Sequence, residues 1–294
     1  MHRSTKYDVA VLGGGPGGYT AAIRAAQRGL RTVCIENDDH LGGVGVNWGC
    51  IPSKAMLNYT QRYRDARKML GAMGIETGDI TFSFEKMQQA KLDSVRRCTD
   101  DIAKTFKKLR IDHCAGWGKF VNDREISVDL LRGGNQKIEA KNFIIATGSL
   151  PNELKNLPFD EQYICSSSGA LEQEKVPKTL FIYGGGIVGI EIACCYARLG
   201  SDVTVVQRGN KLCTFLDSEI AVHYVKAVEE DGVKFMVDTE INVAENFEEE
   251  GIYLNMTDIS GGQKREFAEK TDVVLVSVGR TPNTKNIGLD KAGI

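Results

Sequence analysis

The sequence has little net charge, no long apolar run and no paired cysteine spacing, and each of these absences excludes a class of protein. Its 37 basic and 39 acidic side chains leave a formal net charge of −2, which indicates neither a nucleic-acid footprint nor a polybasic membrane patch. No apolar run approaches the length of a membrane span. We therefore expect no nucleic-acid or membrane partner, no metal site, and small molecules as ligands.

The eight cysteines do not follow the spacing of a disulfide framework. A chain of 294 residues can bury a sizeable core in each of about two domains without disulfide staples. This favours a reducing compartment. The start, residues 1–7, leads almost at once into an expected strand, which leaves no room for a signal peptide. We expect a cytoplasmic protein, or one of the mitochondrial matrix if a eukaryotic presequence has been removed. The cysteines are residues 34, 50, 98, 114, 165, 194, 195 and 213.

Two segments of the chain have the same order of parts. In the first, an apolar strand is followed by a glycine-rich turn, a helical stretch and a second strand that ends at Glu36. The second segment repeats this order and ends at Gln207. The interval is 171 residues both from the first glycine, Gly13, to its counterpart Gly184 and from Glu36 to Gln207. Such a constant interval indicates two copies of one structural unit.

Each turn has glycines at the three positions that a dinucleotide-binding turn requires. The first glycine makes the tight turn, the second lets backbone approach the pyrophosphate, and the third lets the helix pack on the strand. The helix N-terminus then faces the phosphates. A lone turn of this kind can be a packing device, but two copies in register predict two nucleotide sites. The glycines are Gly13, Gly15 and Gly18 in the first turn and Gly184, Gly186 and Gly189 in the second.

The remaining segments complete an α/β fold with two Rossmann-like dinucleotide-binding domains. Residues 70–109 are expected to be mainly helical, and residues 113–140 to form short strands with a Gly-Gly turn. Residues 143–146 read as a strand that returns to the first sheet. Residues 233–257 alternate like sheet, and the acidic run at 248–250 is expected to be a solvated loop.

One segment of the chain points to a particular family. It covers residues 41–54 and reads Leu-Gly-Gly-Val-Gly-Val-Asn-Trp-Gly-Cys-Ile-Pro-Ser-Lys. This segment resembles the redox-active segment of the dihydrolipoamide dehydrogenase family, within the pyridine nucleotide-disulfide oxidoreductases. The resemblance continues at residues 116–119, 146–149 and 279–283 and at Glu191. It implies FAD and NAD as cofactors, and a reaction in which a dithiol substrate reduces FAD, which in turn reduces NAD. The implied partner is dihydrolipoamide, or the lipoyl domain of a 2-oxoacid dehydrogenase or glycine cleavage complex.

The resemblance also implies a domain order. Residues 1–149 would be the first part of an FAD-binding domain, residues 150–270 an NAD(P)-binding domain, and residues 271–294 the start of the return to the FAD domain. The family's interface domain, which makes the homodimer and supplies a histidine base, would lie beyond residue 294. None of the histidines at 2, 40, 113 and 223 has a matching sequence context, so the base is unassigned.

The family's two redox cysteines stand five positions apart, and only one of them is present here. The flavin-facing cysteine matches Cys50, whereas the position that exchanges with substrate is Gly45. Exchange requires a sulfur atom, so this disulfide cannot form and dihydrolipoamide turnover should be lost or very low. Pro52 suits an early helical position, which would place the Cys50 sulfur beside a helix N-terminus and lower its pKa.

Three interpretations therefore stay open: an impaired dihydrolipoamide dehydrogenase-type flavoprotein with diaphorase activity, a single-thiol redox enzyme that uses Cys50, and a non-catalytic nucleotide-binding fragment.

The resemblance implies an ion pair between Lys54 and Glu191 near the flavin. Gln207 stands where NAD-preferring units carry an acid, and Arg208 follows it, so the coenzyme preference is open, with NAD favoured by the resemblance. The further residues implied for FAD are Glu36, Gly42, Gly43, Lys54, Gly118, Thr147, Gly148 and Ser149, and those implied for NAD(P) are Glu191, Gln207, Arg208 and Gly279.

Overall fold

The computed structural model describes residues 6–247, 251–262 and 264–294. Its contacts divide the chain into two compact units. The acidic run at 248–250 and His2 lie outside the described residues. Within the described ranges, every helix is too short or too polar to cross a membrane. The first unit comprises Met1–Pro52, Leu92–Leu150 and Thr281–Ile294, and the second comprises Ser53–Lys91 and Pro151–Arg280.

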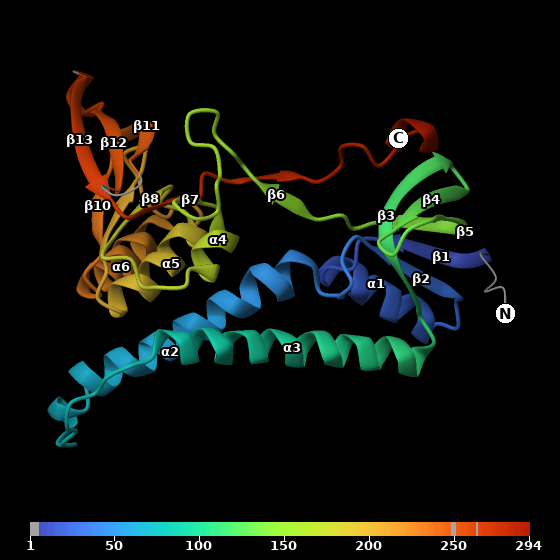
Figure 1. The fold of residues 1–294 in the computed structure, drawn as a ribbon, viewed down its shortest axis with the longest axis horizontal. Helices are drawn as coiled ribbons and strands as arrows, with labels where there is room; N and C mark the ends of the chain where they lie inside the picture. The colour runs from blue at the N-terminus through green and yellow to red at the C-terminus, as the bar shows by residue number, and fades with distance from the viewer. Residues whose placement is uncertain (1–5, 248–250, 263) are drawn as a thin grey trace. The chain divides into compact units, whose positions relative to one another are not determined.

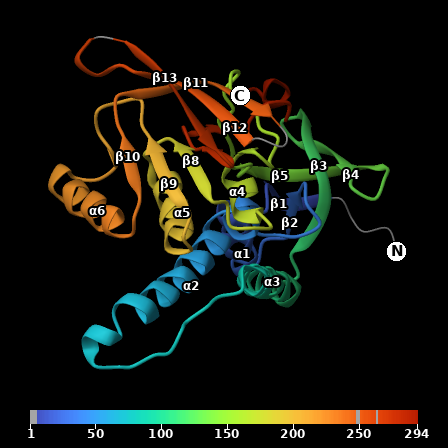
Figure 2. The same cartoon turned by 60° about the vertical axis from the view of Figure 1, so that its left-hand side comes forward.

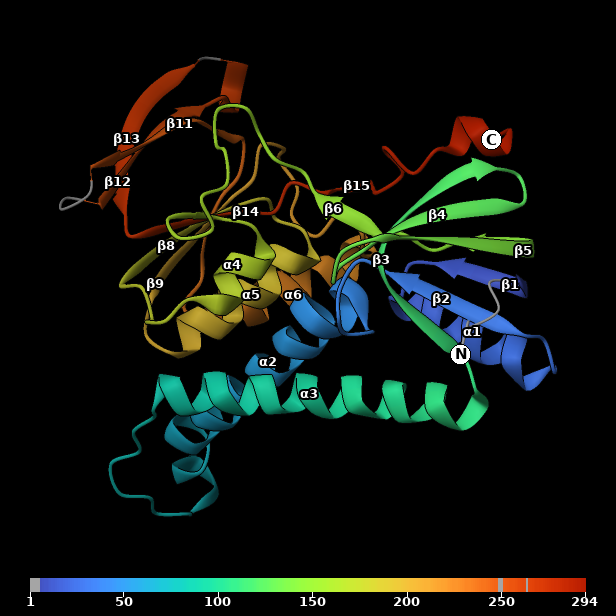
Figure 3. The same cartoon turned by 45° about the vertical axis from the view of Figure 1, so that its right-hand side comes forward.

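The first unit is a ring of five strands with a helix against its parallel part (Figures 1 and 3). β1 pairs in parallel with β2 and β5, β2 pairs in parallel with β3, and the antiparallel meander β3-β4-β5 closes the ring. Apolar residues inside the ring, such as Ile35 and Ile126, are fully buried. The elements are β1 (Lys6–Leu12), α1 (Pro16–Gln27), β2 (Thr32–Glu36), β3 (Asp112–Asn122), β4 (Glu125–Leu130) and β5 (Asn135–Ile145).

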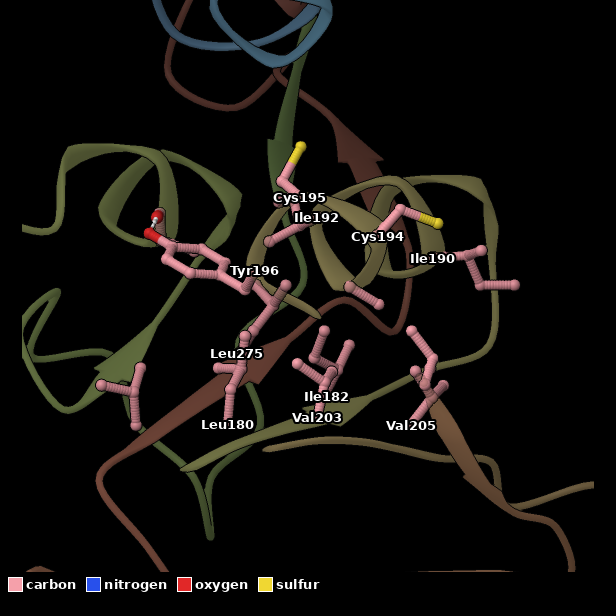
Figure 4. Close-up of a cluster of buried hydrophobic side chains, with 14 of the residues drawn as sticks. Leu180, Ile182, Ile190, Ile192, Cys194, Cys195, Tyr196, Val203, Val205 and Leu275 are labelled. Atoms are coloured by element: carbon pink, nitrogen blue, oxygen red, sulfur yellow. Dashed lines mark hydrogen bonds between the residues drawn. The ribbon is translucent and has the colours of Figure 1, made fainter. Parts of the chain in front are cut away.

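The second unit is built on a parallel sheet of five strands in the order β10-β9-β8-β14-β7. Helices α5 and α6 cover the face of the sheet that carries Leu180 and Leu275 (Figures 2 and 4). The antiparallel sheet β11-β12-β13 packs on the other face, where Val274 and Val276 are buried. The strands are β7 (Ile164–Cys165), β8 (Thr179–Tyr183), β9 (Asp202–Val206), β10 (Lys234–Met236), β11 (Thr239–Phe247), β12 (Gly251–Asp258), β13 (Arg265–Thr271) and β14 (Val273–Val276), and the helices are α4 (Ser167–Glu172), α5 (Ile187–Arg198) and α6 (Ser218–Glu230).

The chain passes between the two units through helices α2 and α3 and through a ribbon of the short strands β6 and β15. Short helical turns complete the fold. The bounds are η1 (Val44–Trp48), α2 (Cys50–Lys68), η2 (Gly71–Met73), α3 (Phe84–Leu109), β6 (Ser149–Pro151), η3 (Ser260–Gly262), β15 (Arg280–Pro282) and η4 (Leu289–Ala292).

The α/β class with two dinucleotide-binding units is confirmed, as are the helix within residues 70–109 and the meander after it. The placement of residue 271 as the start of the return to the first domain needs correction. β14, at Val273–Val276, is a fully buried apolar run that pairs in parallel with both β8 and β7, so it is a central strand of the second unit. The contacts also group residues 53–91 with the second unit.

A buried ion cluster ties together the helices of the second unit. Asp231 caps the C-terminus of α6, and its side chain is only 3% exposed. Its Oδ1 lies 2.7 Å from Nε of Arg64 on α2 in an ion pair, and its Oδ2 accepts from Nε of Arg198 on α5 at 2.8 Å. Because α2 carries Lys54 and α5 carries Glu191, this cluster fixes the two helices that bear the predicted ion pair.

Replacing Asp231 with alanine leaves two partly buried guanidinium groups without their carboxylate. We expect D231A to lower the free energy of unfolding by about 3–5 kcal/mol, since breaking a buried ion pair leaves an uncompensated charge. Urea unfolding followed by circular dichroism measures the change. The matched control is D202A, which removes an exposed partner of Lys234 and should cost less than about 1 kcal/mol. Equal losses in the two variants would contradict the buried role of Asp231.

Candidate functional site

The two glycine-rich turns have the same strand register and helix geometry. Val9 of β1 pairs with Thr32 of β2, and Leu180 of β8 pairs with Val203 of β9, so the 171-residue interval holds for both strands. The next helix begins at Pro16 in one unit and at Ile187 in the other, again 171 residues apart, and each is 12 residues long. The sequence repeat is therefore a repeat in three dimensions.

The first glycine of each turn lies against the backbone of a third parallel strand. Gly13 and Gly184 have φ angles of 105° and 119°, which L side chains rarely adopt. A Cβ at Gly13 would overlap the carbonyl oxygen of Ala146, and a Cβ at Gly184 would lie 2.5 Å from that of Ser277. No other residue type fits at either position.

The third glycine lets the helix pack on the turn. A Cβ at Gly18 would overlap the carbonyl oxygen of Gly13, and a Cβ at Gly189 would lie 2.5 Å from the carbonyl oxygen of Gly184. The middle glycines differ in kind. Around Gly186 no atom lies within 4 Å of the Cβ position, and Gly15 meets only the backbone of residues 42 and 43 at 3.8–4.0 Å. The space above these two glycines is therefore open.

Glu36 and Gln207 close the two turns in the same way. The backbone N–H of Gly14 donates to Oε2 of Glu36 at 2.6 Å, and that of Gly185 donates to Oε1 of Gln207 at 2.8 Å. Glu36 also accepts from the N–H of Asn37 at 2.7 Å. Burial raises the pKa of Glu36, and the backbone hydrogen bonds oppose part of that rise.

The repeat continues beyond the segment that sequence reasoning identified. Leu41 and Leu212 pack over the turns: a Cβ at Gly14 would lie 2.8 Å from Cδ2 of Leu41, and one at Gly185 would lie 2.6 Å from Cδ2 of Leu212. The next residue in each unit donates its N–H to the carbonyl of the same turn glycine, at 2.9 Å and 3.1 Å. The signal was present in the sequence, because both leucines keep the 171-residue interval.

The second turn opens into a cleft of about 660 Å³ within the second unit. It is lined by the glycine-rich turn and by Gln207, Arg208 and Gly279, among others. Arg208 pairs through Nε with Oε1 of Glu240 at 2.6 Å, and its side chain is 75% exposed. The cleft thus collects the predicted NAD(P) residues except Gly189, which packs the helix below, and Glu191.

The other residues predicted for the first site lie in three places. Gly42 and Gly43 follow β2 and pack on the turn, where a Cβ at Gly43 would lie 2.7 Å from Cα of Gly15. Residues 147–149 follow β5, and the Gly148 carbonyl accepts from the N–H of Asn283 at 3.0 Å. Gly118 lies inside the ring, where a Cβ would be 2.6 Å from Cδ1 of Leu12, so its small size serves core packing.

Helix α2 carries two of the residues implied by the resemblance. Cys50 is its first residue and is exposed, and Lys54 follows one turn later on the same face. Nζ of Lys54 donates to Oε2 of Glu191 on α5 at 2.6 Å, which is the predicted ion pair.

In the described part of the chain, no group of three or more His, Cys, Asp or Glu side chains is arranged to hold a metal ion.

Gly45 lies in η1, against the first residue of α1. A Cβ at this position would lie 2.8 Å from Cγ and 3.3 Å from Cδ of the Pro16 ring. The absence of a side chain at position 45 is thus used in the packing of η1 on α1. A cysteine would enter only if the proline ring or η1 moved.

The buried cysteines offer no replacement for the missing sulfur. Burial raises the pKa of Cys165 and Cys195 to about 12 and that of Cys194 to about 11, so these thiols are protonated at neutral pH. Burial raises the thiol pKa in each of the six buried cysteines, which are Cys34, Cys114, Cys165, Cys194, Cys195 and Cys213.

The chain is similar in sequence to known oxidoreductases over nearly its whole length. The profile of the family described as "Pyridine nucleotide-disulphide oxidoreductase" matches residues 7–294. The chain is 42% identical over 290 residues to the dihydrolipoyl dehydrogenase of Trypanosoma brucei brucei, covering 98% of this chain and 60% of that protein. It is 40% identical over 291 residues to the leghemoglobin reductase of Vigna unguiculata, covering 99% of this chain and 55% of that protein.

Solved structures share the fold. LpdA from Mycobacterium tuberculosis superposes with a TM-score of 0.87 at 24% identity, covering 99% of this chain and 62% of that one. At this identity the likeness shows the fold alone. The chain spans 55–60% of the length of the two curated relatives named above. The family resemblance of residues 41–54 and the later motifs is confirmed.

Buried Glu36 should make stability depend on pH. Its pKa is raised on folding, so its contribution to stability is greatest below the ordinary value of 4.5 and is lost as the pH rises through the raised value. As the pH rises from 4 to 7, we expect the free energy of unfolding of E36Q to increase relative to that of the unmodified chain. Urea unfolding at each pH measures the difference. The control E139Q makes the same change at an exposed carboxylate, and a trend of opposite sign in E36Q would contradict the assignment.

The packing of Gly45 on Pro16 can be tested by filling the space. Overpacking at a closed contact typically costs about 1–3 kcal/mol, so we expect G45A to lower the free energy of unfolding by about that amount. P16A removes the ring atoms that the new methyl group would meet. In the P16A background, G45A should therefore lower the free energy of unfolding much less than it does in the unmodified chain. Additive effects of the two substitutions, measured by thermal and urea unfolding, would show that the contact is not closed.

Proposed function

Because the chain belongs to the pyridine nucleotide-disulphide oxidoreductase family, we propose that it is a flavoprotein oxidoreductase of the dihydrolipoyl dehydrogenase type that holds FAD and a nicotinamide nucleotide. The observation that carries this proposal is the repeated geometry of the two glycine-rich turns. Each has a positive-φ glycine against a strand, a third glycine under the helix, and an open middle glycine. That open space is what a pyrophosphate needs for close approach.

In the first unit, Gly13, Gly15 and Gly18 would hold the FAD pyrophosphate at the N-terminus of α1, and Glu36 would accept hydrogen bonds from ribose hydroxyls. In the second unit, the cleft above Gly186 would hold the nicotinamide nucleotide. When bound, FAD supplies two-electron redox chemistry and the nicotinamide nucleotide supplies a hydride. The chain's own residues bind and orient these groups.

Helix α2 would supply the polar groups of the reaction centre. We propose that Glu191 holds the ammonium group of Lys54 in place, 2.6 Å away, and that this positive charge stabilises negative charge on the reduced flavin. Cys50 would present one sulfur at the start of the helix. The dithiol–disulfide step needs a second sulfur at position 45, where the chain has glycine packed on Pro16. The activity that remains is reduction of a small acceptor by the nicotinamide nucleotide.

Curated relatives include mitochondrial dihydrolipoyl dehydrogenases from Arabidopsis thaliana and Homo sapiens. On that basis we propose a reducing compartment, the cytoplasm or the mitochondrial matrix. We also propose that the partner of this site is a lipoyl-bearing protein of a 2-oxoacid dehydrogenase or glycine cleavage complex. Without the exchange sulfur, the dithiol of such a partner would not be turned over.

Two glycine variants separate the two nucleotide sites without disturbing the fold. Neither Gly15 nor Gly186 has positive φ, and a Cβ at either meets nothing closer than 3.8 Å, so valine should be accommodated by the free chain. We expect G15V to lose visible flavin absorbance after reconstitution with FAD. We expect G186V to keep the flavin but to need at least about tenfold more NADH for anaerobic bleaching, since a side chain there occupies the pyrophosphate position.

The unmodified chain should bind FAD, bleach on addition of NADH, and show no turnover of dihydrolipoamide. Circular dichroism checks that both variants are folded. Flavin retention by G15V equal to that of the unmodified chain would contradict the first site. Turnover of dihydrolipoamide by the chain with Gly45 would contradict the role given to the missing sulfur.

A further inference from the structure

Two polar contacts join helix α2 to helix α5 within the second unit. At one end, Nζ of Lys54 lies 2.6 Å from Oε2 of Glu191. At the other end, Arg64 of α2 and Arg198 of α5 reach the same carboxylate, that of Asp231 at the C-terminus of α6. Arg64 follows Lys54 by ten residues and Arg198 follows Glu191 by seven. The two helices therefore run in the same direction and are tied at two levels.

The stretch between the two contacts is closely packed. Met56 of α2 is 4% exposed and belongs to the same apolar cluster as Cys194 and Cys195 of α5. Thr60, one turn after Met56, is fully buried, and its side chain interacts with the Cys195 thiol. Four-residue spacing puts Met56, Thr60 and Arg64 on one face of α2. A shift of this face at one end is transmitted to the other, because a close-packed interior has few voids to absorb it.

The far contact depends on one negative charge. The side chains of Asp231, Arg198 and Arg64 are 3%, 12% and 23% exposed. Without the carboxylate, two guanidinium groups would face each other where α2 meets α5. A second ion pair of Arg64, with Asp65 at 3.9 Å, stays within α2 and ties it to nothing else. The contact between Arg64 and Asp231 thus decides whether this end of α2 is held to α5 or repelled from it.

We propose that Arg64 and Asp231 are positioning residues: by holding the far end of α2 against α5, they fix the place at which the Lys54 ammonium meets Glu191. The inference rests on the proposed function, because that ammonium is the charge assigned to the reduced flavin. Neither Arg64 nor Asp231 is among the described residues that line the nucleotide cleft, so both act through the helices. Loss of the far contact lets the first turns of α2 shift and lengthens the pair.

The reactivity of the Lys54 amine tests this without any bound cofactor. Acetylation by an N-hydroxysuccinimide ester needs the uncharged amine, whereas a carboxylate partner favours the ammonium. The Lys54 side chain is 55% exposed, so the reagent can reach it, and mass spectrometry of the full chain gives its rate. E191Q removes the partner, and we expect Lys54 to react at least about fivefold faster. R64Q frees α2 but leaves Asp231 paired with Arg198, and we expect a rise of about threefold or more.

Three controls separate positioning from general loss of structure. R62Q removes an exposed cation of the same helix, whose contact with Asn58 at 2.9 Å stays within α2, and it should leave the Lys54 rate unchanged. R64K keeps the positive charge and should restore most of the protection. Lys91 is 4% exposed and should react slowly in every variant, because it is reached only when the fold opens.

Combined variants show whether the effects share one route. In the E191Q background, R64Q should add nothing, because no pair is left to displace. D231N should raise the Lys54 rate as R64Q does, and R64Q/D231N should react no faster than D231N. A Lys54 rate in R64Q equal to that of the unmodified chain would overturn the inference. Faster acetylation of Lys91 together with Lys54 would overturn it as well, since that pattern shows an opened fold.

The FAD-loaded chain gives a second readout. We expect R64Q to lower the rate constant for flavin bleaching at saturating NADH by about threefold, with the half-saturating NADH concentration changed by less than about twofold. The opposite split, a raised NADH requirement at an unchanged rate constant, would overturn the inference. A chain that takes up no FAD would refute the proposed function, and the acetylation rates would still decide the role of Arg64 and Asp231.

Discussion

The close packing of a helix on a strand through paired glycines is the constraint on which both units depend. A side chain at Gly18 or Gly189 would strike the carbonyl of the first glycine of its own turn, and that first glycine in turn lies against a third strand. Strand, turn, helix and third strand are thus held in one arrangement, with the helix N-terminus facing open space. The same arrangement then recurs 171 residues later, down to a leucine that packs over each turn.

Much of this fold follows from local sequence. The strand and helix pattern, the glycine spacing and the interval between Gly13 and Gly184 predict both dinucleotide units, because turn geometry leaves so few choices of residue. The place of β14 could not be read in this way, since a short buried run such as Val273–Val276 carries no information about which strands it will pair with. Pairing between distant strands is decided by the whole sheet.

The candidate site shows the same division. Motif positions predict that Lys54 and Glu191 pair, and they lie 2.6 Å apart. The closed contact between Gly45 and Pro16 could not be predicted, because it depends on how η1 packs against α1. The motif implies a cofactor contact for Gly118, and its neighbours Leu12 and Ile35 give its small size a packing role as well. A motif identifies a family position but does not say what touches it.

We propose that one chain holds two different nucleotides at once, in two copies of one unit. Native mass spectrometry of the full chain incubated with FAD and a nicotinamide nucleotide tests it most directly. We expect a species that carries one FAD and one nicotinamide nucleotide per chain, with neither displacing the other. A chain that never carries more than one nucleotide, or in which the two compete for a single place, would contradict it.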